Sequence, residues 1–351
     1  MKKNFYISTI VLVGLLLLVT LGSTGCKKNT ANTLYFYNWA VYTPDSVIKK
    51  FEKEFGVKVV YDDYASNEDM YAKLKAGGSG YDIVVPSGDY VTIMQQQGML
   101  QEIDLSKIPN VSYITPETLR KATYDPQMKW SVPYYMGAAG IAVNTEKVPT
   151  YEESWSIFGR KDLANRMSML DDMREVLGDA LAYLGYSVNT SNQKELDEAL
   201  DLVNNQWKPN LVKFDAEGFG KAFASGEFWV VQGYAETVFG EIPASRRDKV
   251  AFFIPKEEGG PMYIDSLCIP KGARNSELAH SFINFILRPE IYAEFLDTFG
   301  FPSTIHSEAG KLQKVTPYYS ADSIVNCELK EDLGENLEKY NQIWQKIRFT
   351  E

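Results

Sequence analysis

Residues 34–61 read LYFYNWAVYTPDSVIKKFEKEFGVKVVY, and this stretch decides the predicted fold. The apolar run at its start predicts a buried strand over 34–38. Pro44 opens a predicted helix that carries its apolar side chains on one face, and Gly56 ends it. A second apolar run predicts a strand over 57–61. This order of strand, helix and strand is typical of a parallel sheet covered by helices.

The alternation of strands and helices continues beyond this stretch and then changes. Two more helices and a third strand are predicted up to Gly98. Residues 133–144 (PYYMGAAGIAVN) are rich in small side chains and predict an extended crossing between domains, at which Gly137 and Gly140 permit a hinge. A second mixed region follows up to about residue 263. At roughly 100–200 residues per domain, a chain of 351 residues is expected to be an α/β protein of two domains.

The composition limits the classes of function. The chain has 36 Lys and Arg against 46 Asp and Glu, a net charge of −10, which argues against sequence-independent binding to nucleic acid or to an anionic membrane. It contains two histidines and three cysteines, without a C-x-x-C, H-E-x-x-H, G-x-S-x-G or phosphate-loop motif. We therefore expect neither an enzyme nor a metal or cofactor site. Cys268 and Cys327 are predicted to be free, buried thiols, and a disulfide between them is the alternative.

The first residues of the chain are typical of an export signal. Two lysines precede an almost wholly apolar run over 8–21, which is shorter than the about 20 residues that span a bilayer. The sequence GSTGC at 22–26 then resembles a bacterial lipobox, with Ser where the common pattern has Leu. The resemblance implies a signal peptide over 1–25, a lipidated tether over 26–32, and a body that Cys26 anchors to a membrane in the bacterial periplasm. A plain signal peptide or an uncleaved anchor is the alternative.

Aromatic and acidic residues collect after the predicted strands, where open α/β sheets bind ligands. Aromatic faces and carboxylates together suit an elongated organic cation, because rings attract ammonium groups and carboxylates accept their N–H groups. Tyr263 and Asp265 are the sharpest pair, since they share one face of a strand and a carboxylate in an apolar run needs a partner. Asp172 and Glu175 can instead simply favour a helix N-terminus, and Trp39 can instead be a core residue.

Seven segments carry a resemblance to a known family. They are LYFYNWAVY at 34–42, SNEDMYAKLKAG at 66–77, YDIVVPSGDYV at 81–91, LDDMREVLGDALAYLGYS at 170–187, YIDSLCIP at 263–270, INFILRPE at 283–290 and FGFPS at 299–303. Through them the chain resembles the polyamine-binding proteins of bacterial ABC importers, of the spermidine/putrescine-binding type. The resemblance covers nearly the whole chain after the signal.

The resemblance implies a two-lobed periplasmic-binding-protein fold, in which each lobe is a mixed sheet flanked by helices and the ligand lies in the cleft between the lobes. It places residues 33–137 and 264–307 in the N-terminal lobe, and residues 138–263 and 308–351 in the C-terminal lobe. It also implies a monomer that captures putrescine or spermidine and delivers it to a membrane permease and its ATPase, without chemistry and without a cofactor.

The family's ligand-binding positions transfer residue by residue onto this sequence. Asp172 and Glu175 would hold one terminal ammonium, and Asp265 would face an inner or second amine. Tyr234 falls where the family has a wall tryptophan, and Phe301 where it often has a tyrosine. The implied ligand-binding residues are Trp39, Tyr42, Ser87, Asp89, Asp172, Glu175, Tyr234, Tyr263, Asp265, Phe301 and Lys330.

Four departures from the family pattern bear on the choice of ligand. Asp89 stands where a close relative has an aromatic residue, which adds a carboxylate near the cleft. Lys330 stands where a spermidine binder has glutamine, and a cation there opposes a long, triply charged ligand unless it turns away. Ala40 and Ala216 replace small hydroxyl residues. These changes weaken one end of a spermidine-length site and leave putrescine, spermidine or both as ligands.

Three other functions stay open at the level of sequence. The first is a binding protein for another small organic cation or an amino acid, although acids outnumber Arg174 near the site. The second is a surface glycoside hydrolase that uses paired carboxylates. The third is an adhesin or structural lipoprotein that makes no use of its cleft.

Overall fold

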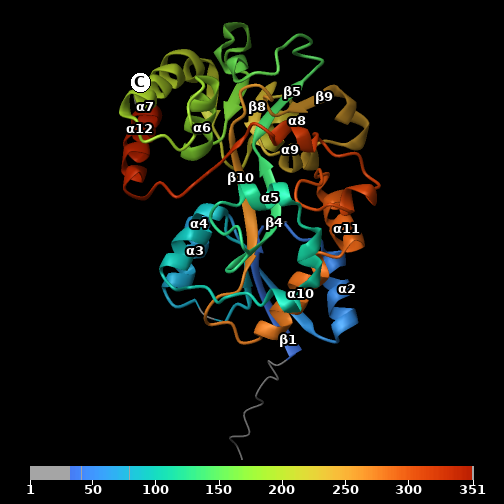
Figure 1. The fold of residues 1–351 in the computed structure, drawn as a ribbon. Helices are drawn as coiled ribbons and strands as arrows, with labels where there is room; N and C mark the ends of the chain where they lie inside the picture. The colour runs from blue at the N-terminus through green and yellow to red at the C-terminus, as the bar shows by residue number, and fades with distance from the viewer. Residues whose placement is uncertain (1–31, 41, 79, 350–351) are drawn as a thin grey trace, which may run out of the picture.

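The computed structural model describes residues 32–40, 42–78 and 80–349, and the predicted export signal and Cys26 lie outside these ranges. Two sheets, each flanked by helices, form two lobes that lie one above the other in Figure 1. The prediction of a two-lobed α/β fold is therefore confirmed. None of the helices in the described ranges is long and apolar enough to cross a membrane.

The first sheet lies in the lower lobe of Figure 1, and its strand order is β11-β10-β3-β1-β2, with β4 paired to β10. Strands β1 and β2 are parallel over seven residue pairs, which confirms the strand–helix–strand unit predicted for residues 34–61. The strands are β1 Thr33–Trp39, β2 Lys58–Tyr64, β3 Ile83–Val84, β4 Ser131–Ala138, β10 Pro261–Cys268 and β11 Glu328–Leu329. The helices that belong to this lobe are α2 Asp45–Phe55, α3 Asn67–Lys75, α4 Gly88–Gln96, α5 Pro116–Lys121, α10 Ser276–Ile286 and α11 Pro289–Phe299.

The second sheet lies in the upper lobe, and its strand order is β7-β6-β8-β5-β9. It is mixed, because β6 runs parallel to β7 and β8 whereas β5 runs antiparallel to β8 and β9. The strands are β5 Gly140–Asn144, β6 Met167–Met169, β7 Leu211–Phe214, β8 Val230–Gly233 and β9 Val250–Phe253. The helices are α6 Met173–Tyr183, α7 Gln193–Leu202, α8 Phe219–Ser225, α9 Ala235–Glu241 and α12 Leu337–Phe349.

Helix α2 shows why the opening stretch of sequence folds as predicted. Gly56 ends the helix in the left-handed conformation, with φ of 64°, which glycine adopts without steric cost. The apolar face buries Val47 and Phe51 against the sheet. The Phe51 ring meets Phe282 of α10 edge-on at 4.9 Å. Each fully buried side chain of this size stabilises the lobe by about 1.5–3 kcal/mol.

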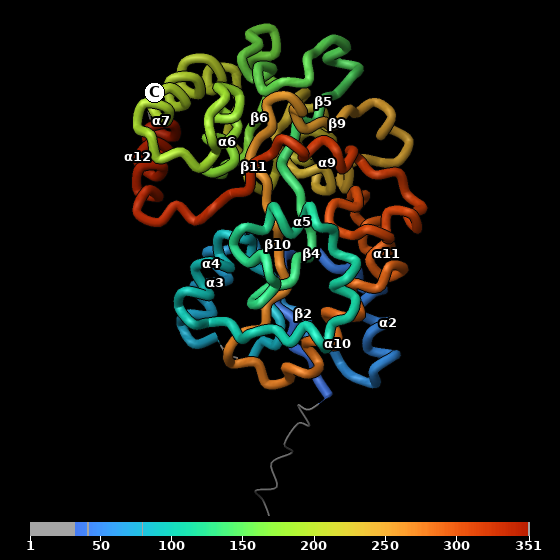
Figure 2. The backbone as a smooth tube through the Cα atoms, viewed as in Figure 1, coloured from blue at the N-terminus to red at the C-terminus, as the bar shows by residue number. Residues whose placement is uncertain are grey.

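Strands β4 and β10 join the lobes, and they run side by side through the middle of the molecule in Figure 2. Within the stretch 133–144, a single residue, Ala139, separates β4 of the first sheet from β5 of the second. Neither Gly137 nor Gly140 has a positive φ. A Cβ atom on Gly137 would lie 2.6 Å from Tyr263 Oη, and one on Gly140 would lie 2.6 Å from a Phe252 ring carbon. These glycines therefore allow close packing at the crossing.

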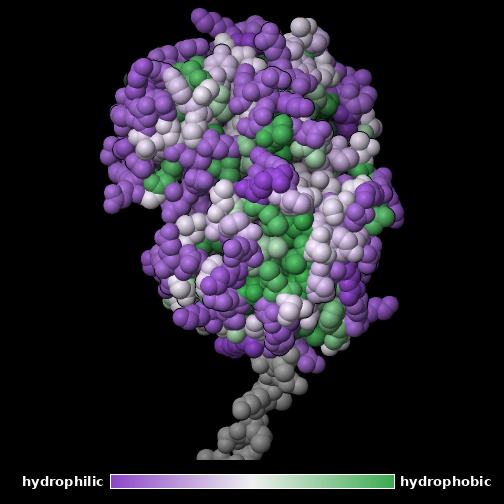
Figure 3. Space-filling view, viewed as in Figure 1, coloured by the Kyte–Doolittle hydropathy of each residue, from purple (hydrophilic) through white to green (hydrophobic). Residues whose placement is uncertain are grey.

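Each lobe has its own hydrophobic core. In the upper lobe, buried hydrophobic side chains of α6, α7 and α12 pack around the fully buried Trp155, Trp207 and Tyr340. In the view of Figure 3, hydrophilic side chains cover most of the face, and hydrophobic ones gather in the middle of the lower lobe. Cys268 and Cys327 are free and buried, as predicted.

Candidate functional site

A buried carboxylate on the crossing strand β10 is the centre of the candidate site. Asp265 is 4% exposed, and its two oxygens accept hydrogen bonds from Ser87 Oγ at 2.7 Å and from Tyr42 Oη at 2.9 Å. Burial raises the pKa of Asp265 to about 6, and the two hydroxyl hydrogen bonds act against that rise. Three of the implied ligand-binding residues, Tyr42, Ser87 and Asp265, are thus in hydrogen-bond contact.

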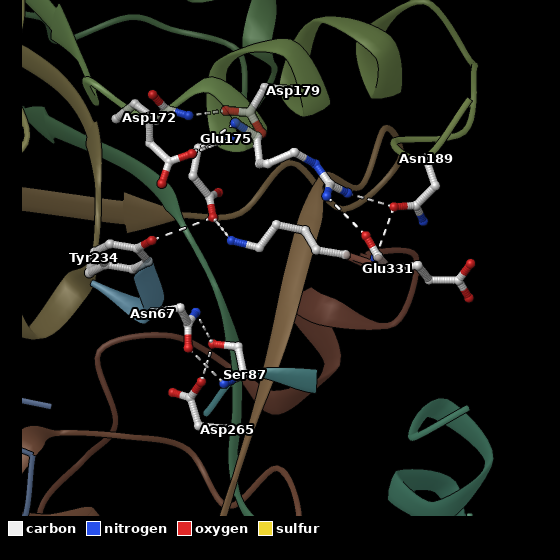
Figure 4. Close-up of polar contacts among 12 residues, drawn as sticks. Asn67, Ser87, Asp172, Glu175, Asp179, Asn189, Tyr234, Asp265 and Glu331 are labelled. Atoms are coloured by element: carbon white, nitrogen blue, oxygen red, sulfur yellow. Dashed lines mark hydrogen bonds and ion pairs between the residues drawn. The ribbon is translucent and has the colours of Figure 1, made fainter. Parts of the chain in front are cut away.

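Asn67, which is not among the residues predicted from sequence, holds this arrangement in place. Its Oδ1 accepts from the Ser87 backbone N–H at 3.1 Å, and its Nδ2 donates to Ser87 Oγ at 3.1 Å (Figure 4). Because the Ser87 hydroxyl already accepts from Asn67, its own proton points at Asp265. Asn67 opens α3 and Ser87 precedes α4, so two helix starts position one carboxylate.

Trp39 and Tyr42 lie at the same end of the first sheet. The Trp39 indole N–H donates to the Val85 carbonyl at 2.9 Å, which fixes the half-buried ring at the end of β1. The Tyr42 ring is 8% exposed and meets Phe301 edge-on at 6.2 Å. The indole N–H of Trp39 and the hydroxyl of Tyr42 are therefore both hydrogen-bonded within the lower lobe.

Phe301 lies behind Tyr42 in the core of the lower lobe. Its side chain is 1% exposed, and its ring stacks on Tyr135 at 4.1 Å with an interplanar angle of 19°. The predicted ligand-contact role of Phe301 stays a prediction, and its observed contacts are those of a supporting core residue.

Tyr234 and Tyr263 form an aromatic pair contributed by different elements. Tyr234 stands at the start of α9 in the upper lobe, and Tyr263 is on β10. Their ring centroids are 6.0 Å apart in a T-shaped arrangement. The Tyr234 hydroxyl donates to Glu175 Oε1 at 3.4 Å, which links the pair to the acids of α6 (Figure 4).

Asp172 and Glu175 have different environments at the start of α6. Asp172 caps the helix, because its Oδ1 accepts from the backbone N–H groups of Arg174 at 2.8 Å and Glu175 at 3.1 Å. Glu175 is fully buried and forms an ion pair with Lys330, while its Oε2 has no partner. Burial raises the pKa of Glu175, and the Lys330 charge opposes that rise. Asp172 therefore caps the helix, which was the alternative role considered for these two acids.

Asp89 and Lys330 line the same cavity, of about 430 Å³, between α4 and the segment after β11. Burial raises the pKa of Asp89, and the positive charge of Lys330 opposes the rise. The Lys330 side chain is 15% exposed and turns inward to Glu175. Two of the four departures from the family pattern, Asp89 and Lys330, therefore lie at one side of the site.

Two further carboxylates near the site, Asp179 and Glu236, are not among the residues predicted from sequence. Asp179 lies one helical turn after Glu175, is fully buried, and accepts a hydrogen bond from Gln232 Nε2. Burial raises the pKa of Asp179 well above its usual value. Burial also raises the pKa of Glu236, in the first turn of α9, to about 7. The spacing of four residues between Glu175 and Asp179 was a sequence signal for Asp179, and it carries no information about Glu236.

The arrangement can bind a cation with more than one N–H group. Acids come from both lobes, namely Asp265 near the lower lobe and Glu175 in the upper lobe, and aromatic rings lie between them. Within the described ranges, no three His, Cys, Asp or Glu side chains are grouped so that they could hold a metal ion.

Comparisons with known proteins identify the family. A family model described as "Bacterial extracellular solute-binding protein" matches residues 46–322. The spermidine/putrescine-binding periplasmic protein of Escherichia coli (strain K12) is 38% identical over 338 residues, which are 94% of this chain and 95% of that protein. The putrescine-binding periplasmic protein SpuD of Pseudomonas aeruginosa (strain UCBPP-PA14) is 35% identical and covers 82% of this chain and 83% of its own.

Solved structures show the same relationship. The TpPotD lipoprotein of Treponema pallidum is 60% identical with a TM-score of 0.89, and the match covers 90% of this chain and 99% of that chain. The relatives are named as binding proteins or as a lipoprotein, and none of these names denotes an enzyme. The chain therefore belongs to the bacterial extracellular solute-binding proteins, in the group that includes the spermidine/putrescine-binding periplasmic proteins.

Proposed function

We propose that this protein captures putrescine or spermidine in the cleft between its lobes and delivers it to an ABC permease driven by an ATPase. The observation that carries the proposal is Asp265, a buried carboxylate whose hydrogen-bond partners are the neutral hydroxyls of Ser87 and Tyr42. Asp265 has no ion pair within the described ranges, so an ammonium group of a ligand can supply the missing cation.

The rest of the cleft suits the other parts of a polyamine. Tyr234 and Tyr263 offer ring faces to a methylene chain, and Trp39 is a further half-buried ring at the end of β1 in the lower lobe. At the upper lobe, the unpartnered Oε2 of Glu175 can accept from a terminal ammonium. The names of the Escherichia coli and Pseudomonas aeruginosa relatives support the same ligand class.

A ligand that contacts both lobes would stabilise their closed arrangement, since only differential affinity shifts such an equilibrium. We propose lobes of residues 33–137 with 264–307, and 138–263 with 308–351. The crossings at β4–β5 and β10 support these bounds. Leu329 still packs in the lower core whereas Leu333 packs in the upper one, so the third crossing is spread along the segment before α12.

The position of Arg174 argues against an amino acid as the ligand. Its guanidinium donates to the Glu331 carbonyl at 3.0 Å and to Asn189 Oδ1 at 2.7 Å (Figure 4). The guanidinium also lies over the Tyr340 ring. These contacts hold the nearest arginine in the wall of the upper lobe. A ligand carboxylate would therefore meet acids in the cleft, where like charges repel.

The lipid anchor is part of the proposal. The Treponema pallidum relative is titled a lipoprotein, which supports acylation of Cys26 after removal of residues 1–25. Mass spectrometry of the first residue of the membrane-extracted protein tests it, and an unmodified or uncleaved N-terminus would contradict it.

A thermal-shift panel of putrescine, spermidine, amino acids and sugars tests the ligand class. We expect only the polyamines to raise the unfolding temperature, because a ligand that binds only the folded state stabilises it by about 2.7 kcal/mol at a concentration of about 100 times Kd. A shift with an amino acid or a sugar, and none with a polyamine, would show that the ligand class is wrong.

Polyamine affinity should fall as the pH is lowered through 6. Burial raises the pKa of Asp265 to about 6, so below that pH the carboxyl must release a proton before it binds an ammonium. We expect Kd for putrescine to rise about fivefold between pH 6 and pH 5, measured by calorimetry. Glu236 is a neighbouring group whose pKa is raised to about 7, so a Glu236→Gln variant should keep this slope if Asp265 causes it.

The unliganded protein should show the opposite trend in stability. Because the folded-state pKa of Asp265 lies above its ordinary value of 3.8, the native protein binds this proton more readily than the unfolded chain does. The contribution of this group to the free energy of unfolding therefore rises as the pH falls from about 6 towards 4. If affinity for putrescine were flat between pH 7 and pH 5, Asp265 would not be the anchor.

A further inference from the structure

A chain segment between the two lobes makes contacts that lie apart from the proposed ligand-binding residues. Residues 312–327, which we call the strap, lead from the lower lobe to β11, and in Figure 2 they run on the right between α9 and α11. The lower lobe holds the backbone of the strap. The Lys314 N–H donates to Asp297 Oδ1 of α11 at 2.9 Å, and the Tyr318 N–H donates to the Gly300 carbonyl at 2.9 Å.

The Tyr318 side chain reaches from the strap to the upper lobe. Its ring stacks on Phe239 of α9, with ring centroids 4.1 Å apart and an interplanar angle of 13°. On the side of the lower lobe, a Cβ atom on Gly300 would lie 2.3 Å from a Tyr318 ring carbon, so the ring lies directly against the glycine that ends α11. One aromatic ring is therefore in contact with both lobes.

Arg247 adds a second contact to the Tyr318 ring from the upper lobe. Its Nη2 donates to the Phe239 carbonyl at 3.1 Å and its Nε donates to the Ile242 carbonyl at 3.3 Å, so the end of α9 fixes the guanidinium. The guanidinium lies over the Tyr318 ring at 5.6 Å, within the range of a cation–π interaction. Tyr318 thus has a stacking partner and a cationic partner, and both belong to the upper lobe.

The next residue of the strap, Tyr319, joins the lobes a second time. Its hydroxyl lies 2.9 Å from that of Tyr135 on β4, and its ring centroid lies 5.8 Å from that of Phe252 on β9. Tyr319 is buried in the core of the lower lobe, whereas Tyr318 is half-buried. Tyr318 is therefore the residue whose removal changes the contact between the lobes with the smaller effect on the core.

We propose that Tyr318 is a positioning residue for ligand capture, which stabilises the arrangement of the lobes in which Asp265 and Glu175 face one cleft. The inference rests on the proposed polyamine function. Within the described ranges, Tyr318 makes no hydrogen bond or ring contact with a proposed ligand-binding residue. It acts through the lobes, because dispersion falls steeply with distance and the stack is lost when the lobes turn apart. Affinity falls with the fraction of the protein in the competent arrangement, whatever the ligand.

Calorimetric titration of the full chain with putrescine and with spermidine tests the role of Tyr318. We expect Tyr318→Ala to raise Kd about threefold to tenfold, by the same factor for both polyamines, because the lost contact touches neither ligand. Tyr318→Phe keeps the stack and should stay within about twofold of the natural protein. A change confined to one polyamine, or an unchanged Kd for both, would overturn the inference.

The distance between the lobes separates positioning from a general loss of stability. Spin labels carried by p-acetylphenylalanine in place of Lys53 of α2 and Asp201 of α7 occupy exposed positions on the two lobes. Without ligand, Tyr318→Ala should shift the measured distance distribution, and saturating putrescine should return it to that of the liganded natural protein. An unchanged distribution would also overturn the inference, since a purely structural residue changes stability and leaves the distance between the labels as it is.

Tyr151→Ala is the matched control, because this half-buried tyrosine stacks on Phe253 at 5.6 Å and 7° within the upper lobe. It should change neither Kd nor the distance distribution, and an effect equal to that of Tyr318→Ala would reject the inference. If Tyr318→Ala does not fold, Tyr318→Leu replaces it and should raise both Kd values at least about twofold, and unchanged values would reject the role of Tyr318. If the natural protein binds neither polyamine, the proposed function fails, and the label distances of the unliganded protein still decide whether Tyr318 holds the lobes.

Discussion

Asp265→Asn should lower the affinity for putrescine by about 2–5 kcal/mol, which is roughly thirty-fold to several-thousand-fold, the usual cost of removing one partner of a buried charge pair. Asn has the shape of Asp and can still bond to the hydroxyls of Ser87 and Tyr42, so the cleft should keep its form. What the variant removes is the negative charge that a buried ammonium needs. Calorimetry with putrescine measures the loss.

The stability of the same variant provides an internal check. Burial raises the pKa of Asp265 to about 6, so the ionised carboxylate opposes folding of the unliganded protein at neutral pH. We therefore expect Asp265→Asn to unfold at the same or a higher temperature while it loses affinity. Asp201→Asn, at an exposed position of α7, is the matched control and should change neither quantity. Undiminished putrescine binding by Asp265→Asn would exclude Asp265 as the anchor.

Phe301→Ala should lower the free energy of unfolding by about 3–5 kcal/mol, the range for removing a large aromatic side chain from a core. Phe301 is 1% exposed, stacks on Tyr135 at 4.1 Å and meets Tyr42 at 6.2 Å. Removing its ring leaves a cavity beside Tyr42, whose hydroxyl is one of the two that donate hydrogen bonds to Asp265. Urea unfolding of the unliganded protein measures the effect.

The conservative variant Phe301→Leu separates support from ligand contact. It fills most of the space, so we expect a loss of about 1 kcal/mol in stability and less than a threefold change in putrescine affinity. If Phe301→Leu instead lost most of its affinity without a loss of stability, Phe301 would be a ligand-contacting wall of the cleft, and the supporting role would be wrong.

The local structure of the lower lobe could be predicted from sequence because local periodicity controls it. The apolar face of α2 and the glycine that ends this helix are properties of eleven or twelve consecutive residues. The capping serine of α3, Ser66, is equally local, and its side chain accepts from the Asp69 N–H at 3.1 Å. Such signals need no knowledge of the other lobe.

The role of Asp172 shows where sequence reasoning stops. The spacing of Asp172 and Glu175 allows them to share a helix face, and it equally allows the first to cap the helix. In the structure one Asp172 oxygen caps α6, and Glu175 alone turns into a fully buried ion pair. The choice depends on Lys330, which lies 155 residues away in the sequence.

By itself, the sequence determined the alternation of strands and helices, the crossing over 133–144, and the residue types that a cation-binding cleft requires. Only the tertiary structure decided which of those residues meet. Tyr42 bonds to Asp265 across 223 residues, Lys330 fills the space beside Glu175, and Phe301 lies behind the cleft. The physical reason is that periodicity fixes only the face of an element on which a side chain lies. Its burial, its charge partner and its access to a ligand are set by elements that packing brings together from distant parts of the chain.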